Sequence, residues 1–133
     1  MTKEEHIAYW LKSAEKDWET LEHLLKAKRY VHTLFFGHLY VEKISKAVWI
    51  SRNTENTPPK SHNILSILQR ANVVLTEDQQ TFLLKLHPYQ IEGRYSEDID
   101  TLYEITDADL TNEYIETIKI VVQCLHKLLQ SNK

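Results

Sequence analysis

The 133-residue sequence has few of the residues that break or cross-link a chain: two glycines, three prolines and one cysteine. A single cysteine, Cys124, excludes an intrachain disulfide and favours a reducing cytoplasm. Two isolated glycines cannot form a glycine-rich loop around a phosphate, and no P-loop pattern is present. The sequence therefore gives no support to a nucleotide-binding class built on such a loop.

Long hydrophobic runs are also missing. No run approaches the roughly 18 apolar residues that a membrane span requires. The opening stretch, MTKEEHIAYW, is charged and amphipathic and has no apolar signal-peptide core. Because 42% of the residues are hydrophobic and 26% are charged, the composition is that of an ordinary globular protein. We expect a single cytoplasmic domain over residues 1–133, with no membrane association.

What the sequence does have is helical periodicity. Thr2 and Glu5 form a capping-box pattern, and apolar residues then recur at three- and four-residue steps to about Ala27. No segment alternates with the period of a strand, so the sequence predicts an all-α, antiparallel up-down bundle of four principal helices plus a short one. The other helices are expected at about 30–51, 62–71 capped by Ser61, 76 to just before Pro88, and 107–129, with an irregular connection at 89–100. Thr76 and Gln79 form a second capping-box pattern, which opens the helix that ends before Pro88.

The second predicted helix is unusual because it is apolar on nearly all sides. One broad side is hydrophobic, and the opposite side mixes polar with large apolar residues. This pattern predicts that a neighbouring helix, a partner subunit or a cleft covers the second side. Gly37 inside this helix costs about 1 kcal/mol relative to alanine, which favours a close helix–helix approach as its reason. The mixed side carries His38, Glu42 and Lys46 together with Phe35, Leu39 and Trp49, and Lys43 lies at its margin.

Charge is distributed unevenly along the chain. The formal net charge of −3 argues against a general affinity for nucleic acid. Residues 42–70 nevertheless contain five basic and two acidic residues, and residues 92–116 contain nine acidic residues and only Arg94. This asymmetry could orient a charged partner or a second subunit, although two solvated surfaces would have the same pattern.

Familiar catalytic patterns are not found. None of the seven histidines belongs to a Glu-x-x-His or His-Glu-x-x-His pattern, and there is no cysteine cluster, so we expect no metal and no cofactor. No serine or cysteine stands in a recognisable hydrolase arrangement with a histidine and an acid.

Four motifs in order resemble the HEPN domain family of small helical bundles. Trp10-Leu11-x-x-Ala14-x-x-Asp17 is similar to the family's early motif, and Glu42-Lys43-x-x-Lys46-Ala47 to its second-helix signature. His62 matches a histidine that opens the third helix, and Arg94-Tyr95 matches an Arg-Tyr-Pro motif, with Ser96 here in place of proline. The resemblance covers most of the chain.

The resemblance implies two kinds of function. Many HEPN proteins are encoded beside a minimal nucleotidyltransferase, and the family name records a proposed nucleotide-binding role. Others are toxin ribonucleases that use an Arg-x4-6-His motif, usually shared across a dimer. That motif is absent from this sequence: no arginine is followed by a histidine at the required spacing.

We therefore expect a non-catalytic HEPN protein, without assigned catalytic residues, that acts as a homodimer. It would bind a nucleotide, RNA or other polyanionic ligand, or a nucleotidyltransferase partner. The alternatives are a metal-independent endoribonuclease toxin that uses Arg94 with His62 or His38, and a purely structural dimerisation module. The expected ligand contacts are Lys43, Lys46, Arg94, His62 and Glu42, and the expected dimer contacts are Phe35, Leu39 and Trp49.

Overall fold

The computed structural model describes residues 1–131, which form six α-helices and one short 3-10 helix. No strand occurs in this range, so the expected all-α bundle is confirmed. None of these helices has both the length and the apolar composition that a membrane span requires. The elements are α1 (Lys3–Lys26), α2 (Tyr30–Arg52), α3 (Ile64–Arg70), α4 (Glu77–Leu86), η1 (His87–Tyr89), α5 (Ser96–Ile105) and α6 (Ala108–Ser131).

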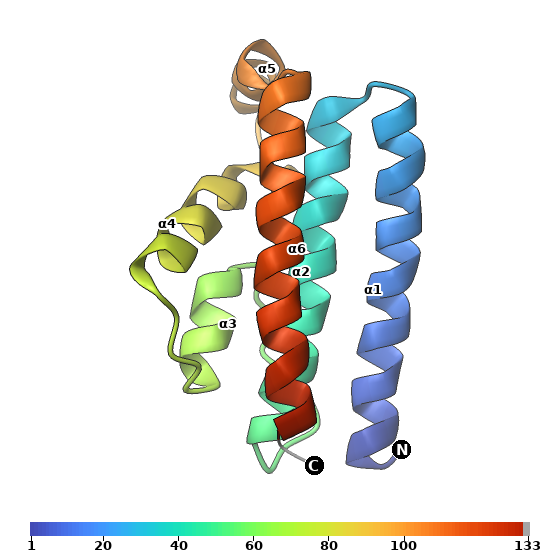
Figure 1. The fold of residues 1–133 in the computed structure, drawn as a ribbon, viewed down its shortest axis with the longest axis vertical. Coiled ribbons are helices and arrows are strands. Elements are labelled where there is room, and N and C mark those ends of the chain that lie inside the picture. The colour runs from blue at the N-terminus through green and yellow to red at the C-terminus, as the bar shows by residue number, and fades with distance from the viewer. Residues whose placement is uncertain (132–133) are drawn as a thin grey trace.

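Three long helices span the bundle from end to end (Figure 1). α2 runs antiparallel to α1 after a tight turn, and α6 then runs in the same direction as α2. Between them the chain returns to the start of α6 through the short helices α3, α4 and α5. Thr2 and Thr76 form the predicted capping boxes with Glu5 and Gln79, which explains where α1 and α4 begin.

α2 is the central helix of the bundle. It packs against α1, α6, α3 and η1, so neighbouring helices surround it on most sides. Residues Val41 and Glu42 and the run from Ile44 to Ile50 are all buried. Neighbouring helices of the same chain therefore explain why large apolar residues occur on both sides of α2.

Gly37 lies where α1 and α6 both approach α2. A β-carbon added at this position would lie 2.8 Å from Ile118 Cδ1 of α6 and 3.5 Å from Leu21 Cδ1 of α1. The close helix–helix approach predicted for Gly37 is confirmed, because only a residue without a side chain leaves Ile118 its present place.

Two local predictions were wrong. Residues 96–100 are not irregular but begin α5, a ten-residue helix that buries only Leu102. Its acidic first turn, Glu97 and Asp98, favours a helix start. Ser61 is not the cap of the third helix: Asn63 accepts the hydrogen bond from the Ser66 N–H at 3.0 Å, so α3 begins at Ile64.

Candidate functional site

A buried carboxylate, Glu42, lies at the middle of α2 with only 3% of its surface exposed. Lys46 Nζ donates to Glu42 Oε2 at 3.2 Å, one helical turn further along α2. His62 Nδ1 lies 3.1 Å and 3.2 Å from the two carboxylate oxygens, and His38 Nδ1 lies 3.7 Å from Oε1. A buried carboxylate needs such partners, because desolvation of a lone charge would cost several kcal/mol.

His38 is the least satisfied member of this group. Its side chain is completely buried, and neither ring nitrogen has a hydrogen-bond partner in the described residues. Burial, followed by repulsion from His87, His62 and Arg94, lowers the pKa of His38 from its ordinary value of 6.5 to about 3. The ring is therefore neutral at pH 7, and the three neighbours that act on it come from three other segments of the chain.

Arg94 reaches this group from the loop between η1 and α5. Its charge lowers the pKa of His38 and, after burial, is the second cause that lowers the pKa of His87. Arg94 Nε donates to the Gln90 carbonyl oxygen at 2.6 Å, which anchors the base of the guanidinium. Within residues 1–131 no carboxylate forms an ion pair with Arg94. The remaining N–H donors of the guanidinium group are therefore available to another group.

We call His38, Glu42, Lys46, His62, His87 and Arg94 the α2 polar cluster. The rings of His38 and His87 lie 6.1 Å apart between centroids. His62 has 57% of its side chain exposed and Arg94 is also exposed, whereas Glu42 and Lys46 are buried beneath. The arrangement places an exposed histidine on a buried, paired carboxylate, and the exposed Arg94 acts on the neighbouring His38.

The structure separates the two predicted lysines. Lys46 stays with Glu42, and its Nζ also lies 5.2 Å from the ring centroid of Trp10, where a cation–π contact is favourable. Lys43 turns to α1 instead, where its Nζ donates to Ser13 Oγ at 2.8 Å. It also lies 2.7 Å from Asp17 Oδ2, off the line of a hydrogen bond, so this contact is an ion pair. Lys43 is thus the one predicted ligand residue outside the α2 polar cluster.

The three predicted dimer residues differ in exposure. Trp49 is 8% exposed and belongs to the hydrophobic core, so contacts within the chain account for its burial. Phe35 and Leu39 are half-buried, and Phe35 packs edge-on against Phe36. Homodimerisation stays a prediction, and the surface left for it is that of Phe35 and Leu39.

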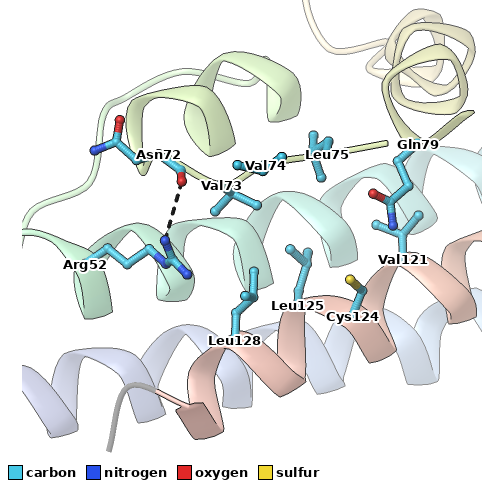
Figure 2. Close-up of a pocket in the computed structure, with 10 residues that line it drawn as sticks. All are labelled: Arg52, Asn72, Val73, Val74, Leu75, Gln79, Val121, Cys124, Leu125 and Leu128. Carbon is cyan, nitrogen blue, oxygen red and sulfur yellow. Dashed lines mark hydrogen bonds between the residues drawn. The ribbon is translucent and has the colours of Figure 1, made fainter. Parts of the chain in front are cut away.

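None of the three cavities described for residues 1–131 is lined by a residue of the α2 polar cluster. Figure 2 shows a cavity of about 210 Å³ between the Val73–Leu75 segment and α6. Its floor is apolar, with Leu125 and Leu128 from α6, and at one end Arg52 already donates to the Asn72 carbonyl oxygen at 3.4 Å. Within residues 1–131 no three His, Cys, Asp or Glu side chains are placed to hold a metal ion.

One member of the α2 polar cluster, His87, was missed by sequence reasoning, as was Gln90, which anchors Arg94 through its carbonyl oxygen. His87 and Gln90 follow α4 without any motif, and the buried Nε2 of Gln90 has no hydrogen-bond partner in the described residues. The only available signal was the position of His87 directly before Pro88, at the end of a predicted helix. Nothing in that position indicates contact with His38, which lies in another helix.

The HEPN domain model matches residues 7–128, which is nearly the whole chain. No curated protein and no solved structure matches this chain. The matched range contains every residue of the α2 polar cluster and all the motifs on which the resemblance was based. The chain therefore belongs to the HEPN domain family.

Proposed function

We propose that this HEPN protein binds a phosphate-bearing ligand, a nucleotide or other polyanion, at the α2 polar cluster without cleaving it. The observation that carries the proposal is that His62, whose second ring nitrogen donates when the ring is protonated, is exposed beside the buried Glu42–Lys46 pair, with the exposed guanidinium of Arg94 acting on the adjacent His38. Arginine holds phosphate with two parallel hydrogen bonds, and its fork has no carboxylate partner in the described residues.

The buried pair would act by positioning. Glu42 holds the ring of His62 through Nδ1, so the other ring nitrogen is directed away from the carboxylate. Lys46 is neutralised by Glu42 and is 7% exposed, so we assign it a supporting role beneath the ligand. The same donors would serve a nucleotidyltransferase partner that presents an acidic group, and a homodimer would bring two clusters into one assembly.

Binding would be measured by isothermal titration with ATP as the probe. We expect Arg94→Lys to weaken binding at least fivefold with an unchanged melting temperature, because lysine lacks the two-pronged fork. Arg70→Lys is the matched control, since Arg70 is exposed on α3 and outside the cluster. Equal affinity in wild type, Arg94→Lys and Arg94→Ala would contradict the proposal.

A second candidate is metal-independent cleavage of RNA. The Glu42–His62 contact favours it, because a carboxylate that orients an exposed histidine is a common general acid–base arrangement. Arg94 would then stabilise the phosphate during cleavage. Incubation of RNA with the wild-type protein, followed by gel analysis, tests this candidate: cleavage that disappears in both His62→Gln and Arg94→Ala would replace the binding proposal.

A further inference from the structure

The turn between α1 and α2 borders a second, larger cavity of about 560 Å³. Lys28, Arg29 and His32 line it from the turn and the start of α2, and Tyr103 lines it from α5. Thr106, in the segment before α6, completes this side of the cavity. No residue of the α2 polar cluster takes part, so the cavity is independent of the site described above.

The charge of this cavity is strongly one-sided. Two of its side chains, Lys28 and Arg29, are cationic, His32 adds an imidazole ring, and no carboxylate lines it. Within residues 1–131 none of the three forms an ion pair, and the first turn of α2 contains no acidic residue. Uncompensated cations that line one concave surface attract an anionic ligand.

Lys28 occupies a backbone conformation that favours glycine. Its φ is 61°, because the turn is closed by two hydrogen bonds: Arg29 N–H to the Leu24 carbonyl oxygen and Lys28 N–H to that of Leu25, both 3.0 Å. Helix ends of this kind usually carry glycine at the left-handed position. Lysine disfavours this backbone conformation, so its presence here indicates a function for its side chain beside the cavity.

Flat rings border the same cations. Tyr103 Oη lies 3.3 Å from His32 Nδ1, and the two ring centroids are 6.2 Å apart. Tyr30 adds a third ring to the lining. Aromatic side chains stack on nucleobases and similar flat groups, and adjacent cations hold the phosphate that such groups carry.

We propose that this cavity binds a phosphomonoester carried on a flat ring, of the size of a mononucleotide. Lys28 and Arg29 hold the phosphate, and the His32–Tyr103 pair contacts the ring. The same chemistry occurs in a free mononucleotide and at the 5′-phosphorylated end of an RNA strand.

The test is a titration with adenosine 5′-monophosphate, followed by amide NMR and calorimetry. Resonances of residues 28–32 should shift, and adenosine and inorganic phosphate should each bind at least fivefold more weakly than the monophosphate. Lys28→Gly should lower the affinity at least fivefold while the melting temperature stays equal or rises, because glycine suits the turn. Arg29→Gln should lower the affinity similarly, whereas Lys26→Gln, in the last turn of α1, should leave it unchanged.

An unchanged affinity in Lys28→Gly and Arg29→Gln would overturn the proposal, as would shifts confined to other residues. Loss of this binding in Arg94→Lys would also overturn it, because the ligand would then lie at the α2 polar cluster.

To identify which molecule carries the bound phosphate, a 5′-phosphorylated RNA hexamer is compared with the monophosphate and with the 5′-hydroxyl hexamer. If the 5′-phosphorylated hexamer binds more tightly than the monophosphate and the 5′-hydroxyl hexamer, the site recognises RNA ends. If the monophosphate binds most tightly of the three, the site recognises free mononucleotides. Failure of the monophosphate and both RNAs to bind refutes the proposal.

Discussion

α2 carries two lysine–carboxylate pairs that are three residues apart in sequence and opposite in character. Lys43 pairs with Asp17 of α1, and the two side chains keep 22% and 12% of their surface exposed. Lys46 pairs with Glu42 of the same helix, and these side chains keep only 8% and 4%. The first pair joins two helices and is partly exposed through Lys43, although Asp17 Oδ2 is buried without a hydrogen bond, whereas the second lies beside the unsatisfied ring nitrogens of His38 and the exposed His62.

The difference separates a charge pair that belongs to the fold from one that is retained for another role. A partly exposed ion pair contributes little to stability and is easily replaced by water. A buried pair beside a histidine with no hydrogen-bond partner costs desolvation energy that better-packed apolar residues would avoid. Retaining it beside the exposed His62 is the pattern expected of a binding site, where local stability is sacrificed for an arranged set of polar groups.

The largest expected effect comes from removing one carboxylate from each pair. Glu42→Ala leaves Lys46 buried without its partner, and we expect a loss of about 3–5 kcal/mol in the free energy of unfolding. Asp17→Ala leaves Lys43 with Ser13 and with access to water, so the loss should be about 1 kcal/mol. Urea denaturation measures the free energy of unfolding of both variants. Equal losses of this free energy would show that the two pairs have the same role.

The next effect concerns pH and His38. Because the pKa of His38 is about 3 in the folded chain and 6.5 in the unfolded one, only the unfolded state takes up this proton between those values. Stability is therefore fully present above pH 6.5 and falls as the pH drops toward 3, by about 3 kcal/mol at pH 4.5. The lowered pKa of His87 acts in the same direction.

His38→Leu should remove most of this acid sensitivity. At pH 7 the variant should be about as stable as wild type, since leucine leaves no buried polar atom without a partner. Denaturation midpoints between pH 7 and pH 4.5 provide the measurement, with the exposed His23→Gln as the control. A slope in His38→Leu as steep as that of wild type would show that another group carries the pH dependence.

The smallest expected effect on stability comes from His62. The ring is largely exposed and Glu42 keeps Lys46, so His62→Gln should cost at most about 1 kcal/mol. Its effect on ATP binding should be much larger, at least fivefold, because glutamine cannot carry the positive charge of a protonated imidazole. Lys60→Gln, in the same loop, should change neither quantity. Unchanged binding in His62→Gln would leave Arg94 as the only contact of the proposed site.

Local sequence predicted an element correctly where the residues of that element alone determine it. The capping boxes of α1 and α4, the long helical periods and the role of Gly37 were all predicted and are confirmed. α5 was missed although Ile99, Leu102 and Tyr103 recur at the three- and four-residue steps of a helix, and it buries only Leu102. The start of α3 was misplaced because Ser61 and Asn63 are both good caps, and only Asn63 bonds the first turn.

The sequence by itself determined that His38, Glu42 and Lys46 share one side of a helix, because residues four apart always do. Only the tertiary structure decided that helices of the same chain cover this side, that Lys43 turns away to α1, and that His62, His87 and Arg94 lie near enough to act on the charge of His38. Those contacts join residues from four separate segments, and no periodicity within one segment encodes them. They follow from the packing of all the helices together, which places side chains that the local sequence leaves unrelated.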